Sequence, residues 1–340
     1  MSSVNKLGYA SMAAGEPLKP FYFEPPEMGV ADVRVSVTHC GVCHTDIQAI
    51  DDFYGITEYP FVPGHEIVGY VSHVGEAVSG LNIGDRVGIG WQGRSCMECE
   101  WCLKGEEQLC MDIVDSATWV PYGGFSSTVV VDHRFAYPLP EGLPSEVAAV
   151  LMCAGISVFS PLLRYARQPS LKVAIMGVGG LGHLAIMFAH GFKHEVTVIS
   201  SSPDKEAQAR AFGADHFILS NDLESLRKHY FYFDDLLVTA TGQIPWNKLL
   251  NIVKKEGRII LVSFPEMAMD PTDLVAHNVS ITGSFLGNRA SMREMLAFAQ
   301  ANSITPMVET MPMAQVNEAI ARVKENKVRY RIVLVNEPVD

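Results

Sequence analysis

The sequence predicts a two-domain α/β protein in which an antiparallel β-barrel is followed by a parallel β-sheet with helices on both faces. Two observations support this fold class. The chain has 340 residues, which exceeds what one compact core usually holds. Its pattern also changes near Cys153, from short strands separated by turn residues to apolar strands that alternate with helical segments. A hydrophobic content of 48% and a charged content of 19% are typical of a soluble globular protein.

The predicted barrel occupies residues 33–131. Its strand segments are VRVSV, EIVGYVSHVG, DRVGIG and FSSTVVV, and Gly, Pro and Asp separate them. Alternating apolar and polar residues with turn residues at this spacing indicate antiparallel strands.

The predicted parallel sheet begins after Cys153, with the strand segments KVAIM, EVTVIS, HFIL, DDLLVTA and RIILVSF. One of the segments between them carries Leu184, Met187 and Phe188 at the i, i+3, i+4 spacing of an apolar helix face. Strands and helices that alternate in this way indicate βαβ units. The last 50 or so residues contain helices and one further strand, which either domain could accept.

The charge of the chain excludes several classes of partner. The formal net charge is -12, and no long Lys/Arg block is present, which argues against binding to nucleic acid or to an anionic membrane. The N-terminus lacks a basic segment followed by an apolar run, and no stretch is expected to approach the roughly 18 apolar residues that span a bilayer. We therefore expect a cytoplasmic protein with small-molecule partners.

Four of the seven cysteines form the motif Cys96-x2-Cys99-x2-Cys102-x7-Cys110. In a reducing compartment such a cluster is a metal site rather than a disulfide framework. Four thiolates on a short loop suit tetrahedral zinc, and the closed shell leaves no position for substrate, so the predicted site is structural. The alternatives are an iron-sulfur cluster and a nucleic-acid-binding zinc ribbon, which the acidic neighbours MECEWC and GEEQ disfavour.

A second group of potential ligands is Cys43, His65 and Cys153. Two thiolates and one imidazole would leave the fourth zinc position open to water or substrate, as catalytic zinc requires. The three residues are far apart in sequence, so their spacing alone leaves open that they are ordinary buried core residues.

Residues 172–176 form an apolar strand that leads into the glycine-rich segment Gly177-Val178-Gly179-Gly180-Leu181-Gly182 and then into a helix. In a dinucleotide site, the first glycine permits the tight turn, the second lets the backbone approach the pyrophosphate, and the third packs helix on strand. The pyrophosphate then lies at the positive end of the helix.

The next strand ends in Ser200-Ser201-Ser202-Pro203-Asp204-Lys205. NAD sites place an acid at this strand end to bind the ribose hydroxyls, but Asp204 comes one turn too late. Three hydroxyls and Lys205 suit a 2′-phosphate instead, which predicts NADP(H). The alternative is that Ser202, before Pro203, is only a helix N-cap.

Together these motifs resemble the zinc-containing medium-chain dehydrogenase/reductase family, in particular its cinnamyl-alcohol-dehydrogenase and bacterial aldehyde-reductase branch. The resemblance spans essentially the whole chain and includes GHEIVGYVSHVGEAV, CAGISVFSPL, GVGGLG, SSSPDK and GSFLGNR. It implies a GroES-like catalytic domain (residues 1–153 and 287–340, with a zinc lobe at about 92–117) and a Rossmann domain (residues 154–286). It also implies a homodimer with two zinc ions per chain that reduces aldehydes to primary alcohols with NADP(H).

The resemblance also assigns roles in the catalytic site. It makes Cys43, His65 and Cys153 the catalytic zinc ligands, with Glu66 as an adjacent carboxylate. Asp46 corresponds to the acid that orients the ligand histidine, and Thr45 to the hydroxyl that hydrogen-bonds the substrate oxygen. Besides the glycine-rich segment and the residues Ser201, Ser202 and Lys205, the implied cofactor-binding residues are His44, Ser157, Ser284, Asn288 and Arg331.

Three departures from the family pattern affect these expectations. Gln48 stands where many members carry the histidine that ends the proton relay, so the proton needs another route. Asn288-Arg289 replaces a small hydroxyl residue of plant members, and the tryptophan of plant enzymes for cinnamyl substrates is missing near Asp115. Trp91 and Trp119 are the candidate walls of the substrate pocket.

Two other functions compete with this interpretation. One is a zinc-free quinone or enone reductase of the same superfamily, against which all seven potential zinc-binding residues argue. The other is a non-catalytic module that binds nucleotides or nucleic acids, which the acidic balance opposes.

Overall fold

The computed structural model describes residues 5–115 and 122–337. By its internal contacts the chain divides into two compact units. Unit 1 consists of Met1–Cys153, Asn288–Gln300 and Thr305–Asp340, and unit 2 of Ala154–Gly287 and Ala301–Ile304. Most of the C-terminal segment therefore rejoins the N-terminal part of the chain.

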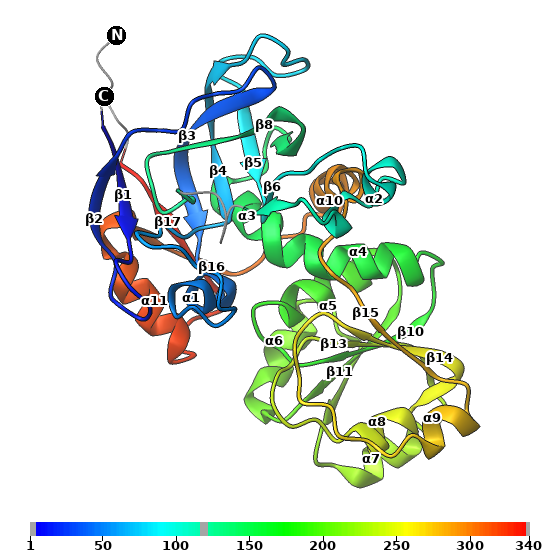
Figure 1. Cartoon of the computed structure of the whole chain (residues 1–340). Helices are drawn as coiled ribbons and strands as arrows, with labels where there is room; N and C mark the ends of the chain where they lie inside the picture. Colours follow the sequence, from blue (N-terminus) through cyan, green and yellow to red (C-terminus); the bar gives the residue numbers. More distant parts are fainter. Residues whose placement is uncertain (1–4, 116–121, 338–340) are drawn as a thin grey trace. The chain divides into compact units, whose positions relative to one another are not determined.

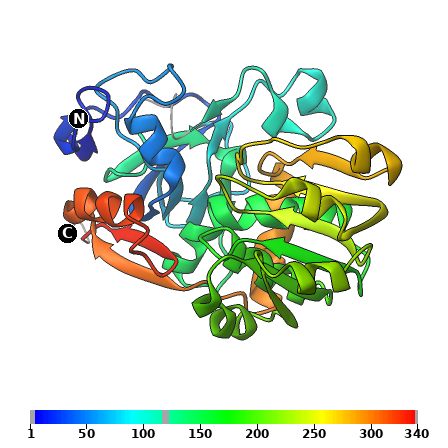
Figure 2. The same ribbon diagram turned by 90° about the horizontal axis from the view of Figure 1, so that it is seen from below.

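Unit 1 is built around a sheet with the strand order β16-β17-β3-β4-β5-β9, and β8 also pairs with β3. These strands are β3 (Asp32–Gly41), β4 (Glu66–Val74), β5 (Arg86–Ile89), β8 (Thr128–Asp132), β9 (Ala136–Pro138), β16 (Val308–Pro312) and β17 (Arg331–Val335). All the pairings are antiparallel except that of β16 with β17, which lie side by side in Figure 2. The C-terminal strand β17 pairs with β3 and so completes the antiparallel sheet that the sequence predicts.

Two short antiparallel pairs accompany the main sheet, β1 (Lys6–Ala10) with β2 (Lys19–Phe23) and β6 (Gln92–Arg94) with β7 (Val114–Asp115). The helices of unit 1 are α1 (His44–Ile50), α2 (Glu100–Leu103), α3 (Ser145–Val150), α10 (Arg289–Ala301) and α11 (Val316–Lys324). Single 3₁₀ turns lie at Glu107–Leu109, His133–Phe135 and Met313–Gln315.

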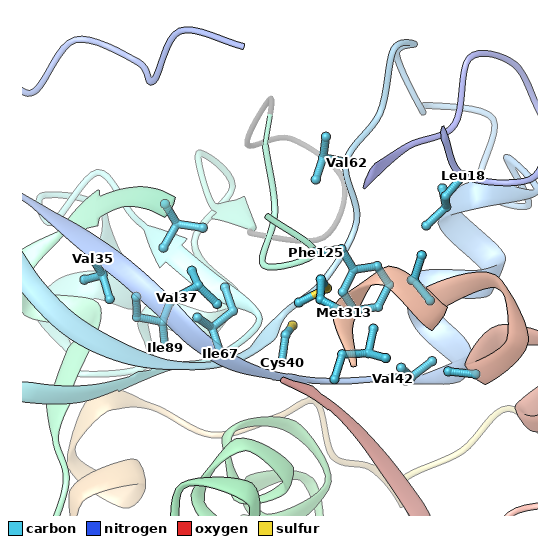
Figure 3. Close-up of a cluster of buried hydrophobic side chains, with 14 of the residues drawn as sticks. Leu18, Val35, Val37, Cys40, Val42, Val62, Ile67, Ile89, Phe125 and Met313 are labelled. Carbon is cyan, nitrogen blue, oxygen red and sulfur yellow. The ribbon is translucent and has the colours of Figure 1, made fainter. Parts of the chain in front are cut away.

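The core of unit 1 follows from the alternation along its strands. Val33, Val35 and Val37 of β3 point to one face and are at most 4% exposed. Figure 3 shows Cys40 among apolar side chains that include Ile67 and Phe125, all of them buried. Burial of each such side chain contributes about 1.5–3 kcal/mol. Cys40 is thus a core residue, outside both groups of potential metal ligands.

Unit 2 is a parallel sheet with the order β12-β11-β10-β13-β14-β15, which confirms the predicted βαβ architecture. Its strands are β10 (Lys172–Met176), β11 (Glu195–Ser200), β12 (His216–Leu219), β13 (Phe233–Val238), β14 (Val253–Leu261) and β15 (Ser280–Gly283). The order reverses at β10, and the first glycine of the glycine-rich segment follows this strand directly. Such a switch point is where doubly wound sheets bind ligands.

Helices cover both faces of this sheet. Figure 1 shows α4 and α5 on one face and α7, α8 and α9 on the other. The helices of unit 2 are α4 (Ile156–Tyr165), α5 (Gly182–Gly191), α6 (Glu206–Ala211), α7 (Leu223–Lys228), α8 (Trp246–Leu250) and α9 (Thr272–Ala276), with a 3₁₀ turn at Pro203–Lys205.

The expectation that no stretch approaches the length of a membrane span was wrong. In the described residues, one helical run, Ser145–Tyr165, has 21 residues and is apolar enough to cross a bilayer. It comprises α3, a π-helical turn at Leu151–Gly155 and α4, and 78% of its most apolar window is buried inside the protein. A helix buried in a protein core is apolar for the same physical reason as one buried in lipid, so length and composition do not separate the two.

Candidate metal and dinucleotide sites

The four cysteines of the motif at residues 96–110 come together in unit 1. Their sulfur atoms all lie within 4.8 Å of one another. The Sγ atom of Cys96 is 3.8 Å from that of Cys102 and 3.5 Å from that of Cys110. Thiolates at the corners of a tetrahedron around zinc, with Zn–S bonds of about 2.3 Å, are about 3.8 Å apart. The spacing therefore fits a structural zinc ion.

The backbone of this lobe turns sharply between the first two cysteines. Met97 adopts a φ of +64°, which turns the chain between the first two cysteines. The Cys99 N–H then donates to Cys96 Sγ at 3.3 Å. Backbone N–H groups of Glu98 and Cys99 lower the pKa of Cys96 to about 7, while burial raises that of Cys110 to about 12. Zinc binds the deprotonated thiolates, so a bound ion would lower the pKa of all four cysteines, including Cys110.

A second group of ligand atoms comes from Cys43, His65, Glu66 and Cys153, also within 4.8 Å of one another. Cys43 is the N-cap of α1, His65 precedes β4, Glu66 begins it, and Cys153 lies in the π-helical turn. The Nε2 atom of His65 is 3.3 Å from Cys153 Sγ. Because three separate elements supply these atoms, their convergence is a property of the fold that sequence spacing does not reveal.

Asp46 holds this second group in place. Its carboxylate accepts hydrogen bonds from Cys43 N–H at 2.9 Å, Gly64 N–H at 3.0 Å and His65 Nδ1 at 2.8 Å. Both Asp46 and His65 are fully buried. With Nδ1–H donating to the carboxylate, Nε2 of His65 is left as the metal-binding atom.

Burial and neighbouring side chains shift the pKa values in the second group. A hydrogen bond from the Cys153 thiol lowers the pKa of Cys43 well below its usual value. Burial raises the pKa of Glu66 to about 8. The positive charge of Arg331, whose Nη1 lies 3.3 Å from Glu66 Oε1, lowers this pKa but does not cancel the effect of burial. Among the described residues, Glu66 Oε2 has no hydrogen-bond partner. Two thiols, an imidazole and this carboxylate oxygen form a donor set that suits zinc.

The remaining residues predicted on α1 lie along its length. Thr45 Oγ1 is 3.7 Å from Cys43 Sγ. His44, the first residue of the helix, is exposed. Gln48, one turn later, accepts a hydrogen bond from the Tyr54 hydroxyl at 2.8 Å. Sequence reasoning identified Gln48 but not Tyr54, since nothing in the motif indicates that the following loop folds back onto the helix.

The three glycines of the dinucleotide motif differ in what surrounds them. Gly177 has a φ of +99°, as the tight turn after β10 requires. A Cβ atom on Gly182 would lie 2.0 Å from the carbonyl oxygen of Gly177, so only glycine lets α5 pack this closely on the turn. A Cβ atom on Gly179 would meet no atom of the described residues within 4 Å. Gly180 and Leu181 complete the turn and are half-buried.

The hydroxyl-rich segment follows β11. Ser202 N–H donates to Ser200 Oγ at 3.2 Å, and Ser201 is exposed. Ser202 occupies the N-cap position of the 3₁₀ turn Pro203–Lys205, but within the described residues its side chain makes no capping hydrogen bond. The N-cap interpretation of Ser202 therefore explains its backbone position and leaves its hydroxyl unexplained.

The other predicted cofactor and pocket residues lie in several elements. Ser157 is half-buried on α4, and Ser284 N–H donates to the carbonyl of Leu261 at 2.9 Å. Asn288 Oδ1 accepts from Ser291 N–H at 2.7 Å and so caps α10. Trp91 is half-buried between β5 and β6, and Trp119 lies outside the described residues.

Sequence reasoning missed an ion pair between the cysteine lobe and α10. The carboxylate of Glu107, which is 1% exposed, accepts hydrogen bonds from the backbone N–H of Arg289 at 3.1 Å and from its guanidinium. Gln92 binds the Glu107 carbonyl at 2.8 Å. From the sequence, Glu107 is only one residue of the acidic segment GEEQ, because a partner 182 residues away leaves no local signal.

Comparison with known proteins agrees with this geometry. The model "Alcohol dehydrogenase GroES-like domain" matches residues 29–141, and the model "Zinc-binding dehydrogenase" matches residues 180–301. The chain is 37% identical to aldehyde reductase AdhA of Synechocystis sp. over 331 residues, which cover 96% of this chain and 97% of that protein.

Two solved structures have the same fold along nearly the whole chain. A cinnamyl alcohol dehydrogenase from Sorghum bicolor matches with a TM-score of 0.93 and 37% identity, over 98% of each chain. CAD from Helicobacter pylori, complexed with NADP(H), matches with a TM-score of 0.89 and 28% identity, also over 98% of each chain. The predicted family resemblance and fold class are thereby confirmed. The chain belongs to the zinc-containing medium-chain alcohol dehydrogenase family and is a zinc-dependent alcohol dehydrogenase or aldehyde reductase of its cinnamyl-alcohol-dehydrogenase-like branch.

Proposed function

We propose that the protein is an NADP(H)-linked reductase of aldehydes to primary alcohols. The observation that carries the cofactor choice is the hydroxyl-rich segment after β11. Ser201 is exposed, and the side chain of Ser202 makes no capping hydrogen bond in the part of the chain that the structure describes. With Lys205 one turn later, these groups suit a 2′-phosphate, which a carboxylate at this strand end would repel.

In this proposal, Cys43, His65 and Cys153 hold the catalytic zinc, and Cys96, Cys99, Cys102 and Cys110 hold the structural one. The closed set of four thiolates serves the fold, whereas the set of three leaves a position for substrate. Zinc at the open site would polarise a carbonyl oxygen, and NADPH would supply the hydride. Glu66 remains beside the site as an additional carboxylate, paired with Arg331.

The residues around the open site have separate roles. Asp46 fixes the tautomer of His65, because it accepts from Nδ1 at 2.8 Å. Thr45 hydrogen-bonds the substrate oxygen and passes it a proton. Gln48 follows Thr45 on the same face of α1, three residues on, and is held by Tyr54 at 2.8 Å. An amide does not carry a proton by changing its charge, so Gln48 would orient neighbouring hydrogen bonds while another group delivers the proton to Thr45.

The glycine-rich turn would hold the pyrophosphate of the cofactor. The open space above Gly179 admits the pyrophosphate to the backbone, and the N-terminus of α5 supplies the positive end of a helix. We assign further cofactor contacts to His44, Ser157, Ser284, Asn288 and Arg331, as the family resemblance implies. Trp91 and Trp119 are the proposed pocket walls. We also propose a cytoplasmic homodimer.

The cofactor proposal is tested by steady-state kinetics with an aliphatic and an aromatic aldehyde. We expect kcat/KM with NADPH to exceed that with NADH at least tenfold, and Lys205→Ala to narrow this ratio by raising KM for NADPH alone. Lys228→Ala, which changes an exposed lysine on α7, is the matched control and should leave the ratio unchanged. Equal use of both cofactors by the unmodified enzyme would refute the role of this segment.

A further inference from the structure

A hollow of about 430 Å³ lies in unit 2 at the amino-terminal edge of the parallel sheet. Its wall is formed by the end of α4, the start of β13 and the first half of β14. The glycine-rich turn begins at the opposite, carboxyl-terminal end of β10. Because β10 has five residues, at about 3.3 Å each, the two places are separated by roughly 16 Å. The hollow is therefore distinct from the dinucleotide site.

The charge of this hollow is opposite to that of the chain. Among the 12 residues that line it, the basic ones are Arg164, Arg167, Lys254, Lys255 and Arg258, and the acidic ones are Asp234, Asp235 and Glu256. The whole chain has 26 Lys and Arg against 38 Asp and Glu. Five basic side chains against three acidic ones give this lining a net positive formal charge, opposite in sign to that of the chain, and such a charge attracts anions.

Two of the cations that line the hollow are held by carboxylates. Arg258 Nη1 donates to Asp235 Oδ1 at 3.1 Å and to the carbonyl of Tyr165 at 3.3 Å, and the guanidinium lies 4.9 Å from the centre of the Tyr165 ring. Lys254 Nζ lies 2.6 Å from Asp234 Oδ1. These contacts fix the positions of the two cations before any ligand binds, which lowers the entropy cost of binding.

One side of the hollow is a bulge in β14. Pairing between β13 and β14 shifts register so that Val253 pairs with Phe233 and Arg258 with Asp235, which loops out the four residues between them. Glu256 adopts a φ of +63° in this loop, and a Cβ atom on Gly257 would lie 2.6 Å from Val253. The tight packing of Gly257 fixes the loop, from which Lys255 and Glu256 project into solvent.

We propose that this hollow is a binding site for a small polyanion that carries phosphoryl groups. Such anions match the chemistry of the lining, since guanidinium groups bind phosphoryl oxygens through paired hydrogen bonds and lysines add point charges. In this proposal, Arg258 and Lys254 are the anchored cations of the site, and Lys255 and the two arginines near the end of α4 add further positive charge.

The test is isothermal titration of the zinc-loaded protein with inorganic pyrophosphate, in the presence of saturating NADPH so that the dinucleotide site is filled. We expect one equivalent to bind and orthophosphate to bind at least tenfold more weakly. Lys255→Gln should weaken pyrophosphate binding at least fivefold, and Glu256→Gln, on the next residue, should tighten it at least twofold. Both side chains are exposed, so these variants leave the fold intact.

The matched controls are Lys228→Gln and Glu224→Gln, which change an exposed ion pair on α7 of the same unit and should leave the dissociation constant unchanged. The proposal is overturned if pyrophosphate gives no binding heat, or if both loop variants bind it like the unmodified protein. It is also overturned if Lys205→Gln abolishes binding, because the anion would then occupy the dinucleotide site. Zinc content is measured after the titration to exclude extraction of metal by the probe.

Discussion

At the scale of single residues, buried polar groups divide into those whose hydrogen bonds are satisfied and those whose bonds are not. Asp46 is fully buried, yet it accepts three hydrogen bonds, from Cys43 N–H, Gly64 N–H and His65 Nδ1. These bonds offset the cost of burying a carboxylate. They also fix the geometry of two potential metal ligands at once.

We predict that Asp46→Asn lowers kcat/KM about 10- to 100-fold and lowers the zinc content toward one ion per chain. The amide retains the shape of Asp46 but loses the charge that holds His65 in its metal-binding tautomer. Kinetics and metal analysis check this. Asp270→Asn is the control, because Asp270 also accepts a backbone N–H, from Thr272 at 2.9 Å, but lies on the surface of unit 2. Unchanged zinc content in Asp46→Asn would contradict the role of this residue.

His194 represents the unsatisfied class. It is 5% exposed, and among the described residues neither ring nitrogen has a hydrogen-bond partner. Burial lowers the pKa of His194 below its usual value, and the nearby Ala166 backbone, too far for a well-formed hydrogen bond, offsets only part of this shift. The folded protein therefore resists protonation of this ring, while the unfolded chain accepts a proton near the ordinary histidine pKa of about 6.5. The free energy of unfolding is therefore highest above that pH and decreases as the pH falls below it, because the unfolded chain binds the proton more readily than the folded protein.

We predict that the thermal midpoint falls less in His194→Leu than in the unmodified protein when the pH is lowered from about 7.5 to about 5.5. Leucine fills a similar volume and does not titrate. His73→Gln changes an exposed histidine and should retain the full dependence on pH. Thermal unfolding followed by circular dichroism measures the three curves. Parallel curves for all three would show that His194 does not titrate in this range.

At the scale of elements, the connection from β10 to α5 shows how one motif combines two requirements. A Cβ atom on Gly182 would lie 2.0 Å from Gly177 O, so close packing of the helix on the turn requires glycine at this position. A Cβ atom on Gly179 would meet nothing within 4 Å in the described part of the chain, so packing does not explain that glycine. We propose that this glycine instead gives the cofactor access to the backbone.

We therefore predict opposite outcomes for two alanine variants. Gly182→Ala should lower the free energy of unfolding by about 3 kcal/mol, because the methyl group forces α5 away from the turn. Gly179→Ala should leave stability within about 0.5 kcal/mol and weaken NADPH binding at least fivefold. Urea denaturation and fluorescence titration with NADPH separate the two effects. If Gly179→Ala bound NADPH normally, the cofactor would not approach this backbone.

At the scale of the whole molecule, the two metal groups are assembled in different ways. The four cysteines of the lobe lie within 15 residues of chain, whereas the open group unites Cys43, His65 and Cys153 from three separate elements. A local site contributes mainly to the stability of its own loop. A site that joins distant elements depends on the complete fold of unit 1.

We predict that Cys153→Ala and Cys110→Ala each lower the zinc content from two ions per chain to one, with different consequences. Cys153→Ala should abolish turnover and leave the far-ultraviolet circular dichroism largely unchanged. Cys110→Ala should lower the thermal midpoint and leave part of the turnover at low temperature. Metal analysis, circular dichroism and kinetics on the same samples check this. The prediction fails if the unmodified protein binds no zinc.

Several features of the fold and site could be predicted because their signals are local. Alternation along a strand, a glycine-rich turn between strand and helix, and cysteines with two residues between them all lie within short windows. The sequence indicated Asp46 and Thr45 only through resemblance, since their roles depend on what they contact. The helical run Ser145–Tyr165 shows the limit of composition, because burial in protein and burial in lipid select the same residues.

The chain's own pattern was thus sufficient for the barrel, the parallel sheet, the cysteine lobe and the family. The contacts between Glu107 and Arg289, between Glu66 and Arg331, and between Tyr54 and Gln48 became visible only in the folded chain, as did the hollow at the sheet edge. The physical reason is that local pattern reflects which surface of an element is buried. Pairing of charges across 182 or 265 residues depends on how the elements pack, and no short stretch of sequence records it.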